Sequence, residues 1–155
     1  MRIFCLTIAS LLAAAPASAA APTKQVSPAP TPEAQQFYDS WGFSGAVRSG
    51  DMIYVSGVVG TQRPNETGPE QGFVRAFEAL SKTLALAGAS WDDVVDMTSY
   101  HTDLGAQMDV FRSVKSRYVK APFPAWTAIG VSRLVPDRGL VEIKVVARAP
   151  AAPPR

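Results

Sequence analysis

Few side chains in this sequence are suited to metal or acid–base chemistry. It holds a single histidine, His101, and a single cysteine, Cys5. A zinc site needs several cysteine or histidine ligands, and the carboxylates follow no familiar calcium-loop spacing. His101 lies in a run typical of a strand, where a structural role is the more economical interpretation and a catalytic base is the alternative. We therefore expect no metal site.

The serine and glycine motifs argue against two common reaction classes. Ser56 stands in Val-Ser-Gly-Val, which lacks the Gly-x-Ser-x-Gly pattern of a hydrolase nucleophile. Gly57 and Gly60 are not followed by the Lys-Ser/Thr of a phosphate-binding loop. A serine at a strand end nevertheless exposes a hydroxyl and a backbone N–H that could hold a polar ligand atom. Simple strand termination explains the Ser56–Gly57 pair equally well.

Hydrophobic spacing predicts the elements that position these residues. Two apolar runs, 43–48 and 52–56, flank the turn cluster Ser49-Gly50-Asp51 and predict a β-hairpin. Apolar residues at spacings of four and three predict a helix over 73–87, with Gly88 as its stop. A second helix is predicted over about 107–119 and is ended by two prolines.

Three further strands are predicted over 94–101, 125–134 and 140–148. Alternation along the last of these turns Glu142 away from the apolar face. The resulting order is ββαβαββ, an α+β fold with both helices on one face of the sheet. The opposite face then needs cover, which suggests an oligomer.

The two ends differ from this folded unit, which we place at residues 37–148. Residues 1–21 have the pattern of a signal peptide, with Arg2, a short apolar stretch and Ala17-Ser18-Ala19 as a cleavage site. We expect export to the periplasm or beyond, with no membrane span in the mature protein; an uncleaved anchor is the alternative. Residues 22–36 are a proline-rich linker and residues 149–155 a disordered tail of similar composition.

The overall charge gives no sign of a nucleic-acid partner. The sequence holds 15 basic and 13 acidic side chains, and loss of Arg2 with the leader narrows that difference. Binding to a phosphate backbone scales with the number of phosphates that are neutralised, so a nearly neutral protein is a poor candidate.

Six segments, taken together and in order, carry a resemblance to a known family. They are 46–51, 54–57, 86–95, 100–104, 122–125 and 141–147. Each is weak alone, but together they span the folded unit and resemble the RidA (YjgF) family. The resemblance implies a chorismate-mutase-like fold that forms a homotrimer with ligand clefts between subunits. It also implies cofactor-free hydrolysis of imines and enamines to keto acids and ammonia.

Part of the family's cleft is retained. The serine–glycine pair matches Ser56 and Gly57, and the cleft glutamate, which is thought to position water with nearby backbone groups, matches Glu142. Glu142 is therefore the candidate catalytic residue, and Ser56 and Gly57 are candidate ligand-binding residues.

The rest of the cleft departs from the family pattern. A tyrosine near the first strand becomes Phe43, an asparagine of the second helix becomes Phe111, and the arginine that grips the substrate carboxylate becomes Trp126. An indole offers one N–H and no charge, so Trp126 cannot replace a guanidinium. Such a lining favours a neutral or aromatic ligand. The alternative is that the three aromatic residues merely fill a degenerate cleft or stabilise the trimer.

Three functions follow as hypotheses. The first is a protein that binds, with hydrolysis left open, a small molecule that is aromatic or lacks a carboxylate. The second is a 2-iminobutanoate/2-iminopropanoate type of deaminase that uses another arginine, namely Arg48, Arg63 or Arg133. The third is a non-enzymatic interaction protein, for which no particular surface stands out.

Overall fold

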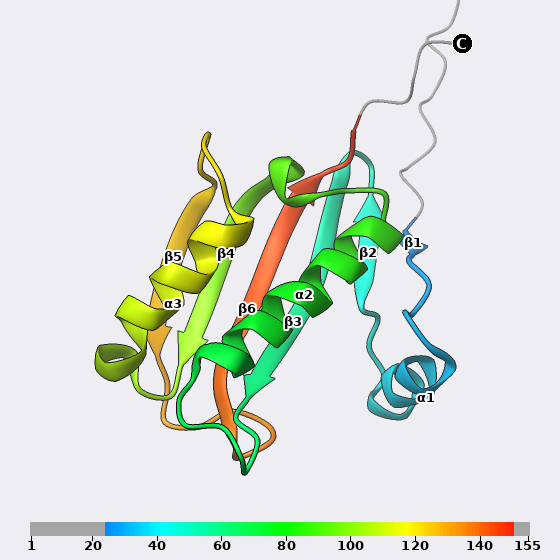
Figure 1. Ribbon diagram of the computed structural model, residues 1–155. Coiled ribbons are helices and arrows are strands. Elements are labelled where there is room, and N and C mark those ends of the chain that lie inside the picture. Colours follow the sequence, from blue (N-terminus) through cyan, green and yellow to red (C-terminus); the bar gives the residue numbers. More distant parts are fainter. Residues whose placement is uncertain (1–23, 151–155) are drawn as a thin grey trace, which may run out of the picture.

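The protein, described by a computed structural model over residues 24–150, is built on one six-stranded sheet of order β1-β2-β3-β6-β4-β5 (Figure 1). Its elements are β1 (Gln25–Val26), α1 (Pro32–Trp41), β2 (Ala46–Ser49), β3 (Met52–Thr61), α2 (Glu70–Leu86), η1 (Trp91–Asp93), β4 (Val94–His101), α3 (Leu104–Tyr118), β5 (Ala125–Gly130) and β6 (Gly139–Arg148). The part from β2 to β6 has the predicted ββαβαββ order, which confirms the α+β fold.

The predicted hairpin is present as β2 and β3. Gly50 occupies its turn with φ of 63°, a left-handed conformation that favours glycine. β3 then pairs antiparallel with β6, and β4 pairs antiparallel with β6 and parallel with β5. Parallel strands need a long crossover connection, and α3 provides it between β4 and β5.

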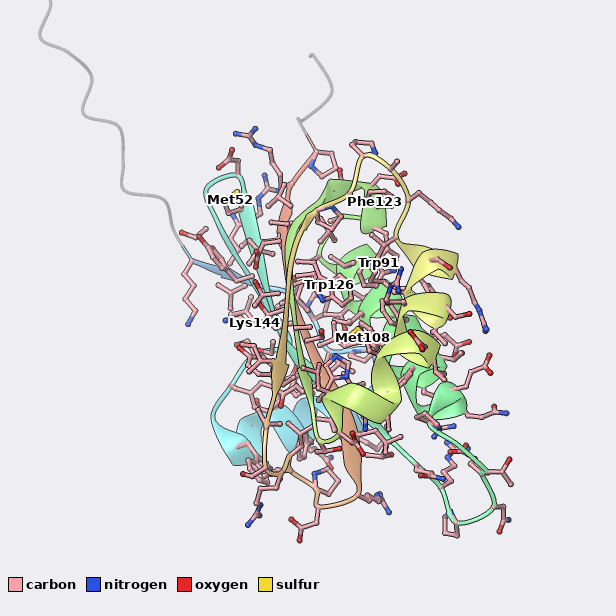
Figure 2. The ribbon with its side chains drawn as sticks, turned by 90° about the vertical axis from the view of Figure 1, so that its left-hand side faces the viewer. Met52, Trp91, Met108, Phe123, Trp126 and Lys144 are labelled. Carbon is pink, nitrogen blue, oxygen red and sulfur yellow. The ribbon has the colours of Figure 1, made fainter. Side chains whose placement is uncertain are left out.

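Both long helices cover the same face of the sheet, as predicted (Figures 1 and 2). The apolar positions of α2 at spacings of four and three are fully buried; they are Phe73, Phe77, Leu80 and Leu84. They pack on the inward positions of the strands, such as Ile53 and Ile143. On the other face of the sheet the side chains are more exposed, and Figure 2 shows Lys144 there.

Local capping explains where several elements begin. The side chain of Asp103 accepts a hydrogen bond from Ala106 N–H at 3.0 Å, so α3 begins at Leu104, three residues earlier than expected. Ser90 and Asp93 form a capping box at η1. None of the helices within residues 24–150 has both the length and the apolar character needed to cross a bilayer.

Residues 24–36 of the predicted linker contain regular secondary structure. Val26 of β1 pairs with Val47, and α1 begins at Pro32 with Thr31 as its N-cap. The physical reason is that proline is suited to the first helical position, where its missing N–H costs nothing. At the other end, Ala149 is buried and its N–H donates to the carbonyl of Asp51 at 2.7 Å. The predicted signal peptide and residues 151–155 lie outside the described residues.

Candidate active site

Four of the six predicted site residues lie together in a hollow of about 520 Å³ on the side of β3 and β6 nearest α1. We call it the β3–β6 hollow. Its lining consists of Phe37, Trp41, Phe43, Ser56, Gly57, Val59, Val135, Pro136 and Glu142. The residues come from α1, the loop that follows it, β3, β6 and the loop before β6. They are brought together only by the folded sheet.

A β-bulge places Ser56 and Gly57 in this hollow. Val55 pairs with Val145 and Val58 with Ile143, so two residues of β3 stand opposite Lys144 alone. At this point Ser56 turns toward the loop before β2. Its N–H donates to Gly45 O at 2.9 Å, and its hydroxyl donates to Ser44 O at 2.7 Å. Both of its hydrogens are therefore engaged, and Ser56 can offer a ligand only its oxygen lone pairs.

Gly57 makes room for the carboxylate of Glu142. A methyl group on Gly57 would stand 2.7 Å from Cδ and 2.9 Å from Cγ of Glu142, closer than real contacts allow. Glu142 alternates outward on β6, as predicted, and is half-buried. Within residues 24–150 its carboxylate forms no salt bridge and accepts no side-chain hydrogen bond. The carboxylate is thus free to act on a ligand or a water molecule.

An aromatic wall, formed by Phe37, Trp41 and Phe43, lines the same hollow as this carboxylate, and sequence reasoning predicted only Phe43. The α1 helix ends at Trp41 and is capped by Gly42, whose φ is 69°, and Phe43 N–H donates back to Tyr38 O at 3.1 Å. This turn brings the Phe43 ring to 5.8 Å from that of Phe37, which lies 5.6 Å from that of Trp41. Thr31 and Pro32 are a helix-start signal in the sequence, and they would have predicted α1, which carries Phe37 and Trp41.

A wider groove of about 900 Å³ continues from the hollow to α2. It shares Phe37, Phe43 and Ser56 with the hollow and adds Arg75, Glu78 and Lys82 of α2, among others. Arg75 is occupied by an ion pair with Glu66, at 2.9 Å between Nη2 and Oε2. The hydrogen bond from Arg75 lowers the pKa of Glu66 to about 2.

Trp126 lies elsewhere, on the helix side of β5 (Figure 2). Its ring is 5.8 Å from that of Phe111, and its indole N–H donates to Ser99 Oγ at 3.0 Å. Phe111 itself is fully buried between the helices and the sheet. This corrects the expectation that Phe111 lines the site, because a core ring has no surface left for a ligand.

The hydrogen bond from Trp126 begins a buried polar chain through His101. Ser99 Oγ lies 3.0 Å from His101 Nε2, and Gln107 Oε1 lies 3.2 Å from Nδ1. Gln107 Nε2 then donates to Thr102 Oγ1. Because an amide oxygen only accepts, Nδ1 carries the proton and Nε2 accepts from the Ser99 hydroxyl. Burial lowers the pKa of His101, which keeps the ring neutral. His101 is structural, as predicted.

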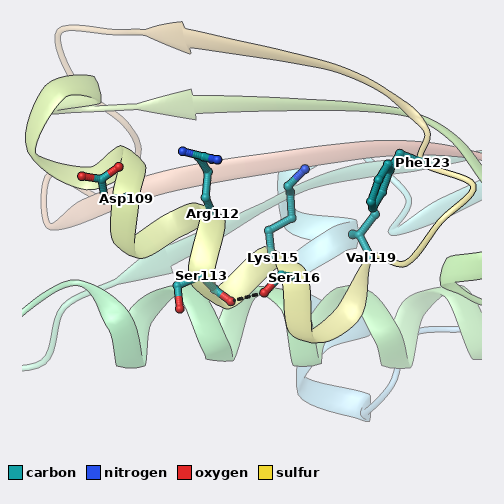
Figure 3. Close-up of a pocket in the computed structure, with 7 residues that line it drawn as sticks. All are labelled: Asp109, Arg112, Ser113, Lys115, Ser116, Val119 and Phe123. Atoms are coloured by element: carbon teal, nitrogen blue, oxygen red, sulfur yellow. Dashed lines mark hydrogen bonds between the residues drawn. The ribbon is translucent and has the colours of Figure 1, made fainter.

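Sequence reasoning did not select two cations of α3: Lys115, which contacts Trp126, and Arg112, which lines the same hollow as Lys115. Lys115 Nζ is 3.9 Å from the centroid of the indole ring, a cation–π contact. Burial, with a smaller contribution from Arg112, lowers the pKa of Lys115. Figure 3 shows Arg112 and Lys115 extending from the same side of α3 toward the sheet, in a hollow of about 430 Å³ that also includes Phe123. Their spacing of three along a helix was the available signal.

The arginines that sequence reasoning did select are placed differently. Arg48 Nε donates to Gly50 O, and Arg133 forms an exposed ion pair with Asp137. The backbone N–H of Arg63 donates to Glu66. None of the three lines the β3–β6 hollow. Within residues 24–150 there is also no cluster of three or more histidine, cysteine or acidic side chains that could hold a metal ion.

Comparison with known proteins places this geometry in a family. The family model described as Endoribonuclease L-PSP matches residues 34–149. The chain is 44% identical over 116 residues to "RutC family protein YjgH" of Escherichia coli, covering 73% of this chain and 87% of that one. It is 31% identical to "2-iminobutanoate/2-iminopropanoate deaminase" of Dermatophagoides farinae, covering 67% and 83% of the two chains.

Solved structures agree with these matches. A structure of protein YJGH superposes with a TM-score of 0.65 at 41% identity, covering 74% of this chain and 89% of that one. RidA from a Psychrobacter species superposes with a TM-score of 0.61 at 30% identity, covering 68% and 87%. Taken with the ββαβαββ order and the shared segments, these matches show that the chain belongs to the RidA/YjgF family, whose family model carries the description Endoribonuclease L-PSP.

Proposed function

We propose that this protein is a cofactor-free hydrolase of small imines that binds its substrate in the β3–β6 hollow without an arginine–carboxylate pair. The observation that carries the proposal is the unpaired Glu142 carboxylate beside the Ser56–Gly57 bulge. A relative at 31% identity is named as an imine deaminase, which supports the reaction class. The arginine of the family pattern is replaced by Trp126 in our reading of the sequence, which removes the usual grip on a substrate carboxylate.

The chemistry requires only a positioned water molecule and a base. Glu142 accepts a proton from water while the oxygen bonds to the imine carbon, and the C=N π electrons move to nitrogen. Glu142 returns this proton to the nitrogen, which gives a carbinolamine. The carboxylate then takes the hydroxyl proton as the C=O bond forms and delivers it to the nitrogen, so the C–N bond breaks and ammonia leaves. The products are a carbonyl compound and ammonia, so one water is consumed and Glu142 is regenerated as a carboxylate.

The lining of the hollow supports an apolar or aromatic substituent on the imine. Six of the side chains that line the hollow are aromatic rings or aliphatic groups; they are Phe37, Trp41, Phe43, Val59, Val135 and Pro136. No basic side chain lines it within the described part of the chain. A substrate carboxylate would therefore enter without a counter-charge from the same subunit, which typically costs about 2–5 kcal/mol in a desolvated site.

A second candidate is hydrolysis of a carboxylate-bearing imine, and the position of Lys115 favours it. We propose a homotrimer in which the α3–β5 edge of one subunit lies next to the β3–β6 hollow of its neighbour. In that arrangement Arg112 and Lys115 would supply the cation that Trp126 does not. The exposed sheet face supports such an assembly, and the predicted signal peptide supports a periplasmic location for it.

The test measures hydrolysis of imines produced in place by an oxidase. An amine oxidase acting on 2-phenylethylamine supplies an imine without a carboxylate, and an amino-acid oxidase acting on alanine or phenylalanine supplies imines with one. Trapping by semicarbazide competes with hydrolysis and reports its rate. We expect acceleration with the first imine and a loss of about 100-fold in Glu142→Gln. The matched control is Lys144→Met, because Lys144 lies two residues after Glu142 and on the same face of β6.

The outcomes separate the candidates. Faster hydrolysis of the carboxylate-bearing imines, lost in Lys115→Met, would favour the second candidate. No acceleration of any imine above buffer would refute both. Trp126→Arg, which the sequence alone suggests as a gain of carboxylate binding, is a poorer test because it also breaks the bond to Ser99.

A further inference from the structure

The α1 helix carries large aromatic side chains that contribute little to the core. Trp41 is 63% exposed and Phe37 is 49% exposed, and α1 has no buried residue. In Figure 1 the helix lies away from the layer formed by α2 and α3. Exposed aromatic residues that gather at a cavity mark a binding site more often than a stability element. Their function must therefore be sought in the β3–β6 hollow that they line.

The rings are arranged as walls around the hollow. Phe37 and Phe43 meet nearly at right angles, with an interplanar angle of 85°, and Phe37 and Trp41 are inclined at 43°. Trp41 and Phe37 stay largely exposed in this arrangement, so part of each ring remains available to a ligand in the hollow. Among residues 24–150, Glu142 is the only charged residue that lines this space, and it forms no ion pair with any of them.

These two features favour the same ligand charge. The face of an aromatic ring carries negative potential and attracts a cation within about 6 Å of its centroid. A carboxylate without a partner adds a full negative charge to the same space. A neutral ligand uses neither attraction, and an anion is repelled by Glu142. The basic residues Arg75 and Lys82 line the wider groove toward α2 and not the hollow.

We propose that the β3–β6 hollow is an aromatic cage for an organic cation, formed by Phe37, Trp41 and Phe43 with Glu142 as its anionic wall. The ligand is an ammonium or iminium nitrogen that carries an apolar or aromatic substituent and no carboxylate. For the iminium ion this inference rests on the proposed function and specifies its substrate. Two-electron oxidation of a primary amine yields such an iminium ion, so an amine-oxidising reaction is the class that would supply it.

The test is calorimetric titration of the full mature protein with three probes of similar shape. They are 2-phenylethylammonium, which is a cation, 2-phenylethanol, which is neutral, and 3-phenylpropanoate, which is an anion. We expect the cation to bind at least about tenfold more tightly than the alcohol, and the anion to bind most weakly. Glu142→Gln should remove that tenfold preference and leave the alcohol's affinity within about twofold.

Aromatic variants separate the cage from general stickiness. Trp41→Leu should weaken cation binding about fivefold or more, whereas Tyr54→Leu, an exposed tyrosine outside the hollow, should leave it within about twofold. Equal affinity for the ammonium and the alcohol, or unchanged cation binding in Glu142→Gln, would overturn the cage. Cation-selective binding without imine hydrolysis would refute the proposed function and keep the cage. Imine hydrolysis without a preference for the cationic probe would support the proposed function and overturn the cage.

Discussion

Replacement of Ser99 by alanine removes the centre of the buried polar chain. Ser99 Oγ accepts from the Trp126 indole at 3.0 Å and lies 3.0 Å from His101 Nε2. Both neighbours lose their partner when the hydroxyl is deleted. His101 is fully buried, so water cannot replace the lost donor without a rearrangement of the core. The variant therefore tests whether this chain holds Trp126 in place.

The expected cost follows from the burial of the two orphaned groups. An unsatisfied polar group in a protein interior costs about 1–3 kcal/mol. The full range applies to His101 Nε2, and its lower end applies to the half-buried Trp126 N–H, which water can approach. We expect Ser99→Ala to lower the free energy of unfolding by about 2–4 kcal/mol.

Urea denaturation at fixed protein concentration measures this change, because an oligomer would make stability concentration-dependent. Trp126→Phe and the Ser99→Ala/Trp126→Phe double variant complete a double-mutant cycle. The double variant no longer carries an indole N–H to orphan, so its cost should fall below the sum of the single costs by about 1 kcal/mol. A loss below about 0.5 kcal/mol in Ser99→Ala, or strict additivity in the cycle, would refute the reasoning.

Three further predictions concern charge and close contact. Because burial lowers the pKa of His101, its contribution to stability should be complete above about pH 6.5 and decline as the pH falls below that value. His101→Asn should flatten this part of a urea midpoint-versus-pH curve. The pKa of Glu66 is lowered to about 2 by Arg75, so the stability it confers should be lost as the pH falls from 4.5 toward 2, and Glu66→Gln should remove that slope in acid titrations. Gly57→Ala should displace the Glu142 carboxylate and reduce imine hydrolysis as far as Glu142→Gln does. Its unfolding free energy should change by less than about 1 kcal/mol, because the displaced atoms belong to a flexible side chain; retained activity would show that the carboxylate is not needed where it stands.

The elements with a strong local period were predictable. The spacing of Phe73, Phe77 and Leu80 predicts α2 because each turn of the helix returns an apolar residue to the sheet. Alternation along β6 likewise predicts the outward direction of Glu142, which the structure confirms. β5 was predicted to run to residue 134 but ends at Gly130, since apolar content alone does not reveal where pairing with β4 stops.

The misses have two different causes. The helix α1 was not predicted, because a high proline content is typical of a linker. The position of one of these prolines matters more: Pro32 directly after Thr31 is a helix-start signal. Phe111 was assigned to the site by its position in the family pattern, whereas its helical spacing with Tyr118 indicates the core. The hydrogen bond from the Trp126 indole to Ser99 joins β5 to β4, and these strands meet only in the folded sheet. A local sequence pattern therefore cannot predict it.

The way in which α1 is attached has a consequence for how this protein can change over time. The helix adds no buried side chain to the core and joins the sheet through the turn at Gly42 and the ring contacts of Phe43. Substitutions along it can therefore accumulate without approaching the stability threshold that purges most mutations. In such an architecture ligand preference can drift among descendants while the scaffold is inherited intact, so homologues that share this sheet need not share a substrate.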